Sequence, residues 1–351
     1  MGEKTAIITG ACGLVGSAAV EMLSNNDEYN VIGIDNDMRR YFFGDSGSTA
    51  KMLHELGEKD NVKMHTCDIR NTDVLSILFK DIKSIDLIIH AAAQPSHDWA
   101  AKEPLTDFGV NAVGTLNMLE LAREFCPEAT FCHISTSKVY GDNPNRLPLE
   151  ELDTRYEINK LHRYAEGIDT SMSIDNCLHS LFGVSKASGD LLVQEYGRYF
   201  DMPTVCFRPG CVTGSNHAGV ELHGFLSYLV KCGLSGRKYS IFGYEGKQVR
   251  CNIHADDLIE ACLAFHKSPR PGSVYNIGGG RDSAISILEA IDLVQQLTEK
   301  EFNYTYIEKP RIGDHIWWIS DNYHLSEDYE WFPQNSNVNK LIEEIYDAEL
   351  Q

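Results

Sequence analysis

Hydrophobic and polar positions alternate in blocks along the first two-thirds of the chain. Short, nearly continuous apolar runs occur at residues 5–9, 31–35, 62–66, 87–91, 130–135 and 204–208. Between them, apolar residues recur at helical spacing, for example over residues 15–23, 110–125 and 182–200. Strands that are apolar throughout, separated by amphipathic helices, are typical of a parallel sheet covered on both faces. The pattern therefore predicts an α/β fold with a doubly wound parallel sheet.

The pattern loosens after residue 208. Glycine, histidine and asparagine cluster at residues 210–219. Helical spacing returns at residues 225–232, 256–266 and 286–300, and strand-like runs return at 239–246, 249–254 and 274–277. Because no repeat or low-complexity linker interrupts the chain, we expect a first domain at residues 1–208 and a smaller, interwoven substrate-binding lobe at residues 209–351. Parts of that lobe, about residues 249–266, are expected to return to the first domain.

The composition is that of a globular chain with a strong acidic excess. Of the 351 residues, 43 % are hydrophobic and 23 % are charged, and 31 Lys and Arg stand against 51 Asp and Glu, which gives a net charge of −20. Such a surface repels nucleic-acid phosphates and anionic membranes, and no apolar run reaches the ~18 residues of a membrane-spanning helix. We therefore expect no nucleic-acid partner and no membrane partner.

The ten cysteines and thirteen histidines show no metal-ligand spacing. The sequence has no C-x-x-C pair and no H-E-x-x-H motif, so we expect no metal. Several cysteines, including Cys132, Cys206 and Cys262, lie in apolar runs, which indicates reduced core thiols and a cytoplasmic protein. No secretory leader pattern precedes the first strand-like run, which favours the same location.

Three glycines separate the first strand from the first helix, in the pattern Gly10-x-x-Gly13-x-x-Gly16. Glycine allows a tight turn there and lets a pyrophosphate approach the backbone at the N-terminus of a helix. The strand before and the helix after give the motif the context it requires. The sequence therefore predicts a Rossmann-type fold in which a dinucleotide is held by Gly10, Gly13, Leu14, Val15 and Gly16.

Acidic residues follow the second and third strands. Asp35 ends the second strand nineteen residues beyond the last glycine, where a carboxylate accepts hydrogen bonds from the adenosine ribose and disfavours a 2′-phosphate. This favours NAD over NADP, although Arg39 and Arg40 follow closely and suit a phosphate. Asp68 follows the third strand, where it suits an adenine edge or caps a helix. The predicted cofactor contacts beyond the glycines are Asp35, Asn36, Asp68 and Ile69.

Further motifs carry a family resemblance. They are His90-Ala-Ala-Ala93, Asn111, Ser135-Thr-Ser-Lys-Val-Tyr-Gly141 and Phe182-Gly-Val-Ser-Lys186. With the glycines they resemble the extended short-chain dehydrogenase/reductases. The S-T-x-K-V-Y-G-D run at residues 135–142, the long segment to His179-Ser180 and Gly246-Lys-Gln-Val-Arg250 make the chain most similar to the CDP-paratose (CDP-tyvelose) 2-epimerases. The resemblance implies NAD-dependent epimerisation at C2 of a CDP-sugar through a transient ketone. It also implies a nucleotide-diphosphate-sugar substrate and a homodimer or tetramer.

The same resemblance assigns roles to individual residues. Thr136 matches the hydroxyl that hydrogen-bonds the reacting oxygen. Lys186 matches the lysine that grips the nicotinamide ribose and lowers the pKa of the acid/base. Asn111 matches a residue that fixes a helix near the cofactor, and Ala91 and Ala93 are placed with the cofactor contacts; for Asn111, an ordinary helix asparagine is the alternative.

One position departs from the family pattern. The family's acid/base is a tyrosine four residues before the lysine, on the same helix face, and this sequence has Phe182 there. A phenyl ring has no proton to move. Either another base acts, or the chain is a substituted form, or it has lost the chemistry and kept the binding site. Nearby candidates for another base are His97, His179, Tyr140 and Ser96. His97 ranks first because its loop follows the fourth strand, where relatives contact the sugar.

Binding of a sugar nucleotide requires concentrated positive charge on this acidic chain. Arg250 resembles the family's diphosphate arginine, and Arg311 in Arg311-Ile-Gly-Asp314 resembles a second one. Surface ion pairs are the alternative for both, and Cys251 stands where relatives have an aspartate. The predicted substrate contacts are Ser96, His97, Asn216, His217, Arg250 and Arg311.

Two other functions fit the same sequence. One is another sugar-nucleotide enzyme on this scaffold, a C4-epimerase, dehydratase or decarboxylase. Dehydratases carry acidic residues after the threonine, whereas Ser137 and Lys138 follow here. The other is a non-catalytic protein that binds NAD or a sugar nucleotide, which Phe182 favours.

Overall fold

The computed structural model describes residues 3–215 and 224–350 and divides the chain into two compact units. Unit 1 holds residues 1–136, 184–208 and 258–275, and unit 2 holds residues 137–183, 209–257 and 276–351. The sequence pattern predicts a boundary after residue 208, with about residues 249–266 returning to the first domain. Residues 137–183 group with the second unit, and residues 258–275 return to the first. The chain is therefore interwoven more often than its sequence pattern indicates.

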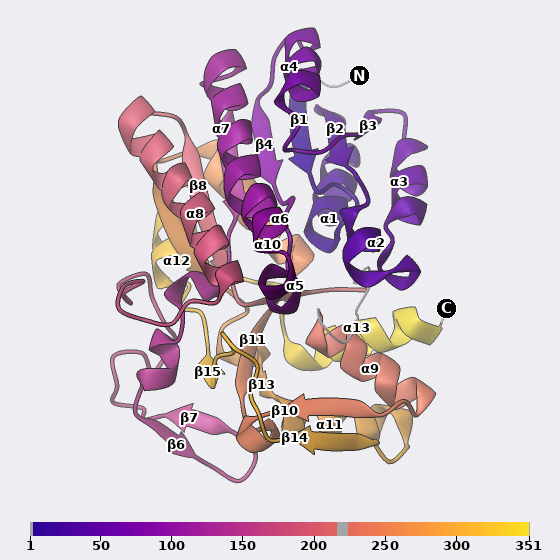
Figure 1. The fold of residues 1–351 in the computed structure, drawn as a ribbon, viewed down its shortest axis with the longest axis vertical. Helices are drawn as coiled ribbons and strands as arrows, with labels where there is room; N and C mark the ends of the chain where they lie inside the picture. Colours follow the sequence, from indigo (N-terminus) through magenta and orange to yellow (C-terminus); the bar gives the residue numbers. More distant parts are fainter. Residues whose placement is uncertain (1–2, 216–223, 351) are drawn as a thin grey trace. The chain divides into compact units, whose positions relative to one another are not determined.

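A parallel sheet forms the centre of unit 1 (Figure 1). Among the described residues it has seven strands in the order β12-β8-β5-β4-β1-β2-β3, and neighbours from β8 to β3 run parallel. Its strands are β1 (Lys4–Thr9), β2 (Tyr29–Asp35), β3 (Val62–Thr66), β4 (Leu87–His90), β5 (Thr130–Ile134), β8 (Thr204–Pro209) and β12 (Ser273–Ile277). These strands lie where the apolar runs predict them, and the predicted Rossmann-type fold class is confirmed.

Helices cover both faces of this sheet. On one face, residues of α4 (Thr72–Asp81), α7 (Gly114–Phe125) and α8 (Leu181–Phe200) form one core with side chains of the strands. Members of that core are Ile7, Ile88, Phe131, Leu75, Met118 and Val193. Figure 1 shows α7 and α8 side by side in front of the strands. A π-helical turn, Gly109–Val113, precedes α7 within the predicted helix at 110–125.

The opposite face of the sheet is covered by other helices. Cys132, next to Phe131 on β5, contacts the Cys262 carbonyl on α10 (Ala255–Lys267). Since adjacent strand residues point to opposite faces, α10 lies on the other side from α7. The remaining helices of unit 1 are α1 (Leu14–Ser24), α2 (Met38–Phe43), α3 (Ala50–Gly57), α5 (His97–Lys102) and α6 (Pro104–Phe108).

Unit 2 is built around strand β11. Its strands are β6 (Leu149–Glu151), β7 (Tyr156–Ile158), β9 (Cys211–Thr213), β10 (Tyr239–Phe242), β11 (Val249–His254), β13 (Ala284–Ser286), β14 (Tyr304–Ile307) and β15 (Trp317–Trp318). β11 pairs in parallel with β9 and β15 and antiparallel with β13. Its helices are α9 (Phe225–Ser235), α11 (Ile287–Thr298), α12 (Tyr323–Tyr329) and α13 (Val338–Leu350). α9, α11 and α13 share a core with β10.

The start of α11 shows how local sequence sets an element of this unit. The Ser286 hydroxyl accepts a hydrogen bond from the Glu289 N–H at 3.1 Å, and the Glu289 carboxylate accepts one from the Ser286 N–H at 3.0 Å. This reciprocal pair satisfies backbone donors that the first helical turn leaves free.

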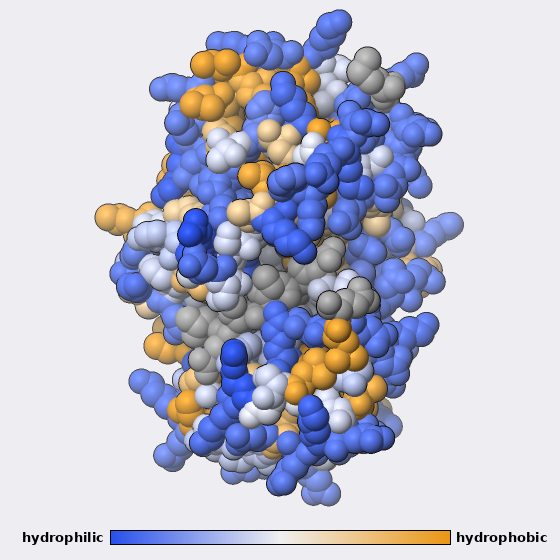
Figure 2. Space-filling view, turned by 90° about the vertical axis from the view of Figure 1, so that its right-hand side faces the viewer, coloured by the Kyte–Doolittle hydropathy of each residue, from blue (hydrophilic) through white to orange (hydrophobic). Residues whose placement is uncertain are grey.

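Hydrophilic side chains dominate the face of the molecule drawn in Figure 2, with hydrophobic patches between them. In residues 3–215 and 224–350, no helix has the length and apolar character needed to cross a membrane.

Candidate functional site

The glycine turn of unit 1 leaves no room for a side chain at Gly10 or Gly16. Gly10 has φ +66°, and a Cβ there would lie 2.7 Å from the Ala92 nitrogen in the loop after β4. A Cβ on Gly16 would lie 2.0 Å from the Gly10 carbonyl oxygen. Gly13 caps α1, and half-buried Leu14 and Val15 begin that helix. The backbone at the N-terminus of α1 is thus open in the way a pyrophosphate requires.

Asp35 is held rigidly beside this turn. Its Oδ2 accepts a hydrogen bond from the Cys12 N–H at 2.9 Å, and its Oδ1 accepts one from the Asp37 N–H at 2.8 Å. Burial raises the pKa of the Asp35 carboxyl, which these two backbone donors oppose. A carboxylate has about four lone-pair positions, so Asp35 keeps capacity to accept ribose hydroxyls.

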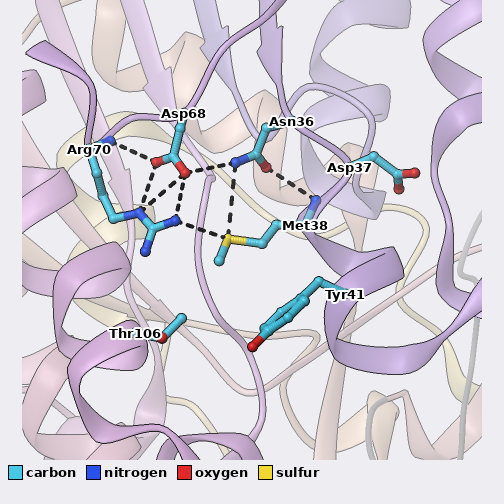
Figure 3. Close-up of a pocket in the computed structure, with 7 residues that line it drawn as sticks. All are labelled: Asn36, Asp37, Met38, Tyr41, Asp68, Arg70 and Thr106. Carbon is cyan, nitrogen blue, oxygen red and sulfur yellow. Dashed lines mark hydrogen bonds and ion pairs between the residues drawn. The ribbon is translucent and has the colours of Figure 1, made fainter.

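A cavity of about 360 Å³ opens beside Asn36 and Asp37, the two residues that follow Asp35 in the chain (Figure 3). It is lined by Asn36, Asp37, Met38, Tyr41, Asp68, Arg70 and Thr106. The Arg70 guanidinium donates three hydrogen bonds to the Asp68 carboxylate: from Nε to Oδ1 at 3.0 Å, from Nε to Oδ2 at 3.2 Å and from Nη2 to Oδ2 at 2.7 Å. Although burial opposes it, Arg70 holds the pKa of Asp68 below its usual value. Asn36 donates to the same carboxylate at 3.1 Å.

The walls of this cavity suit a flat ring. Figure 3 shows the Tyr41 ring and the Arg70 guanidinium on opposite sides of the opening. Sequence reasoning selected Asn36 and Asp68 but missed Tyr41 and Arg70, although Arg70 directly follows the Asp68-Ile69 pair. Ile69 does not line the cavity; it is 5 % exposed and packs in the core under α7.

Lys186 lies in a buried polar layer of unit 1. Its side chain is 3 % exposed, and Nζ donates to the Ile134 carbonyl at the end of β5 at 2.8 Å. Burial lowers the pKa of the Lys186 ammonium to about 8, while Asp190 opposes that change. Thr136 follows this strand end by two residues, where parallel sheets present side chains to ligands.

Asn111 connects three segments around this layer. Its Oδ1 accepts from the Gln94 N–H at 2.8 Å, and its Nδ2 lies 3.0 Å from the Gln94 carbonyl, the Asp107 carboxylate and the Ser185 hydroxyl. Asn111 is 1 % exposed, so it positions the loop after β4 rather than binding a ligand itself. Half-buried Ala91 and Ala93 lie in that loop.

Ser96 is a structural residue of the same loop. It is 1 % exposed, and its hydroxyl caps α5 by accepting from the Trp99 N–H. The expectation that Ser96 contacts substrate, or acts as a base, is therefore not supported. His97 is the first residue of α5 and is half-buried.

Two of the four candidate bases, Tyr140 and His179, lie in unit 2, and each makes a hydrogen bond within the protein. The Tyr140 hydroxyl donates to Asn276 Oδ1 at 2.8 Å, and the side chain is fully buried. His179 Nε2 lies 2.8 Å from the Val139 carbonyl, so this nitrogen carries the proton and donates it. The contact of Tyr140 argues against that residue as the general base, whereas His179 keeps Nδ1, which lies 3.5 Å from the Cys177 Sγ, as its basic nitrogen. Phe182 is 6 % exposed in the first turn of α8.

The predicted diphosphate arginines both lie in unit 2. Arg250 Nη1 donates to the His315 carbonyl at 2.5 Å, and Arg250 Nη2 lies 3.6 Å from Asp314. Cys251, which stands where relatives have an aspartate, is buried against Ser283. The Arg311 guanidinium lies over the Phe242 ring, 4.1 Å from its centroid.

Two of the predicted substrate contacts, Asn216 and His217, lie outside the described residues. Lys138 was not selected from the sequence, yet it contacts Asp314 at 3.5 Å.

Across the ranges 3–215 and 224–350, His, Cys, Asp and Glu side chains form no group suited to hold a metal ion.

Comparison with known proteins identifies the family of the chain. A family model described as GDP-mannose 4,6-dehydratase matches residues 7–315. The chain is 30 % identical to the CDP-paratose 2-epimerase of Salmonella typhi, over 97 % of this chain and 98 % of that protein. It is 26 % identical to a dTDP-glucose 4,6-dehydratase of Escherichia coli, over 96 % of this chain and 91 % of that protein.

Solved structures of nucleotide-sugar epimerases are also similar to this chain. UDP-glucuronic acid 4-epimerase from Bacillus cereus, in complex with UDP-glucuronic acid and NAD, has a TM-score of 0.79 at 26 % identity, covering 99 % of this chain and 100 % of that one. The resemblance drawn from the motifs is therefore confirmed at the family level. The chain belongs to the GDP-mannose 4,6-dehydratase family, the nucleotide-sugar epimerases and dehydratases of the extended short-chain dehydrogenase/reductases.

Proposed function

We propose that this chain is an NAD-dependent epimerase that inverts C2 of a CDP-sugar. The proposal is supported mainly by the glycine turn, Asp35 and the adjoining cavity, which together we call the dinucleotide cradle. All of them lie in unit 1, as Lys186 does. The choice of a CDP-sugar and of C2 is supported by the 30 % identical relative. Ser137 and Lys138 in place of acidic residues disfavour a dehydratase.

The residues present fit NAD. The glycine turn receives the pyrophosphate, Asp35 the adenosine ribose, and the cavity between Tyr41 and Arg70 the adenine. When bound, NAD supplies a reversible hydride acceptor. The Thr136 hydroxyl donates a hydrogen bond to the sugar oxygen, the Lys186 ammonium stabilises negative charge on that oxygen, and His97 removes and returns its proton.

Gly16→Ala is expected to abolish tight NAD binding, because the added methyl overlaps the Gly10 carbonyl at 2.0 Å and opens the turn. We expect the affinity for NAD, measured by calorimetric titration, to fall on the order of tenfold or more. Gly57→Ala is the matched control, since its Cβ would meet Met64 at an ordinary 3.7 Å. Equal NAD affinity in both variants would count against the cradle.

The reaction is tested with a CDP-sugar that carries deuterium at C2. If the chain is a C2 epimerase, the product contains both C2 epimers, each with deuterium retained at C2, and NADH does not accumulate. Loss of water, or inversion at C4, would instead indicate one of the other enzymes of this family.

Phe182 favours a second candidate, a non-catalytic protein that binds NAD or a sugar nucleotide. Tight binding with unchanged sugar would support that candidate. Phe182→Tyr separates it from a catalytically impaired enzyme, because restoring the phenol gives a large increase in turnover only if the rest of the site is functional.

His97→Gln tests the acid/base. We expect turnover to fall about 10²–10⁴-fold with NAD affinity unchanged, the usual contribution of a general acid/base. His54→Gln, at an exposed position of α3, is the control and should keep full turnover. Full turnover of the His97 variant with NAD bound would eliminate His97.

We also propose that the chain is a cytoplasmic homodimer or tetramer. Helix α8 exposes apolar side chains, with Leu191 43 %, Phe200 46 % and Tyr199 82 % exposed, and a second copy would cover them. A monomer mass by light scattering at micromolar concentration would contradict this.

A further inference from the structure

Two short helices of unit 1 pack against each other beside the cavity of Figure 3. Helix α2 carries Tyr41 and Phe42, and helix α5 carries Trp99. The centroid of the Trp99 ring lies 5.5 Å from the ring centroid of Tyr41 and 5.5 Å from that of Phe42. Lys102 Nζ lies 3.8 Å from the Trp99 centroid, a distance suited to cation–π attraction. Aromatic contacts of Trp99 thus join α5 to α2.

A hydrogen bond joins the same two helices. The Tyr41 hydroxyl donates to Glu103 Oε1 at 2.7 Å, where Glu103 directly follows the last residue of α5. Glu103 Oε2 accepts from the Thr106 hydroxyl at 3.0 Å. Tyr41 and Thr106 both line the cavity (Figure 3). Glu103 therefore connects two of the residues that line the cavity to the end of α5.

The order of α5 depends on these tertiary contacts. Helices α2 and α5 have six residues each, and helices of that length are marginal without packing. The start of α5 is fixed by Ser96, whose N–H donates to Gln94 Oε1 at 2.5 Å and whose hydroxyl accepts from the Trp99 N–H. The end of α5 is held by its contacts with Tyr41.

The direction of the His97 side chain depends on how α5 is turned. His97 is the first residue of this helix and precedes Trp99 by two positions. Successive residues of an α-helix are about 100° apart, so these two side chains leave the helix axis about 200° apart. The packing of Trp99 against α2 therefore directs His97 away from α2.

Tyr41 is the member of this group that a bound ligand can cover. It is 57 % exposed, and it lines the cavity that the proposed function assigns to adenine. A purine that stacks on an aromatic ring restricts its motion. Once Tyr41 is restricted, less conformational entropy is lost when Trp99 and Glu103 pack against it. Occupation of the cavity and order in α5 should therefore support each other.

We propose that adenosine in the cavity orders α5 through Tyr41, Trp99 and Glu103, which we call the clasp, and that Trp99 is a positioning residue for His97. The inference rests on the proposed function for the role of His97, whereas the response of α5 to adenosine is independent of that role. The half of NAD that takes no part in hydride transfer thus prepares the helix that acts on the sugar.

The first test is hydrogen–deuterium exchange of the full chain with and without saturating ADP, read over α5 by mass spectrometry. ADP supplies the adenosine half of the cofactor and carries no nicotinamide. We expect the amides of α5 to exchange on the order of tenfold more slowly when ADP is bound. Calorimetric titration establishes that ADP binds under the same conditions.

The hydrogen bond of the clasp is tested by a pair of matched variants. Tyr41→Phe removes the bond to Glu103 and keeps the ring on which adenine stacks, so ADP should still bind but should lose most of its effect on α5. Tyr323→Phe is the control, because Tyr323 lies in unit 2, is 56 % exposed and also donates to a carboxylate, that of Glu327. Its α5 should respond to ADP as the wild type does.

The role of Trp99 is tested by turnover of the nucleotide sugar. Trp99→Leu removes the aromatic contacts with α2, so kcat should fall on the order of tenfold, while NAD affinity and the KM for the sugar stay nearly unchanged. Trp99→Phe keeps an aromatic ring and should recover most of kcat. If Trp99→Leu fails to fold, as shown by its thermal unfolding, the exchange of Tyr41→Phe decides whether the clasp exists.

Absence of ADP binding, equal α5 exchange with and without bound ADP, or a full response of α5 in Tyr41→Phe overturns the clasp. A wild-type kcat in a folded Trp99→Leu protein overturns the positioning of His97. These outcomes are separate from those of the deuterium-labelled sugar. A chain whose α5 responds as described but which leaves the sugar unchanged contradicts only the proposed epimerase. A chain that epimerises while bound ADP leaves α5 unaffected contradicts only the clasp.

Discussion

Replacing Lys186 with methionine is expected to lower turnover of the nucleotide sugar by about 10²–10³-fold, the usual effect of removing one preorganised electrostatic donor. The methylene stem has similar length, so the buried space stays filled. The variant loses the ammonium held by the Ile134 carbonyl. Initial rates at saturating substrate and NAD measure the effect.

The pH dependence of wild-type turnover provides a second check on Lys186. Since burial lowers the pKa of this ammonium to about 8, its charge is present below that pH and is lost above it. If the charged form stabilises the developing oxyanion, turnover falls above about pH 8. An alkaline limit near the ordinary lysine value of about 10.4 would contradict that role.

Structural damage is the competing explanation for a loss of activity in the methionine variant. The control is the thermal unfolding midpoint of each protein, together with its far-ultraviolet circular dichroism. A folded Lys186→Met protein that retains more than about a tenth of the turnover would remove Lys186 from the chemistry, because a tenfold change corresponds to only ~1.4 kcal/mol.

The sheet and the cofactor turn could be predicted because their signals are local. An apolar run such as residues 130–135 marks a strand buried on both faces, and β5 is found there. Gly10 and Gly16 follow from the strand–turn–helix context, and the structure shows the close contacts that require them. Both signals can be recognised within a short stretch of the sequence, even though the contact that excludes a side chain at Gly10 is with Ala92.

The unit boundary and several site contacts could not be predicted, because they depend on distant partners. The Tyr140 hydroxyl is bound by Asn276, and Lys138 meets Asp314, 176 residues later in the sequence. No periodic pattern in the sequence indicates which distant residues form such pairs. Residues 137–183 contain short strands, short 3-10 helices, turns and the first residues of α8, so nothing local showed that they group with unit 2.

Arg208→Met is expected to destabilise the protein by about 3–5 kcal/mol, the usual effect of removing one partner of a buried ion pair. Arg208 Nη2 lies 2.6 Å from Asp190 Oδ1, and the two side chains are 5 % and 1 % exposed. The substitution leaves the Asp190 charge with hydrogen bonds from Ser135 and Gln194 but without its guanidinium. The midpoint of denaturant unfolding measures the loss.

A second substitution, at an exposed ion pair, tests whether burial of the charges causes the loss of stability in Arg208→Met. Arg123 forms an ion pair with Glu120 on the surface of α7, where water screens both charges. Arg123→Met should therefore leave the unfolding midpoint almost unchanged. Equal shifts in the two variants would show that loss of arginine packing, and not the buried charge of Asp190, determines stability.

Removing Asp190 together with Arg208 links this stability to the chemistry. The double variant Arg208→Met, Asp190→Leu removes both charges of this ion pair, so it should recover part of the stability that Arg208→Met loses. It also removes the carboxylate that opposes the effect of burial on Lys186, so the pKa of Lys186 should fall further. The alkaline limit of turnover should then move to lower pH. A more stable double variant with an unmoved pH limit would show that Asp190 stabilises the fold without tuning Lys186.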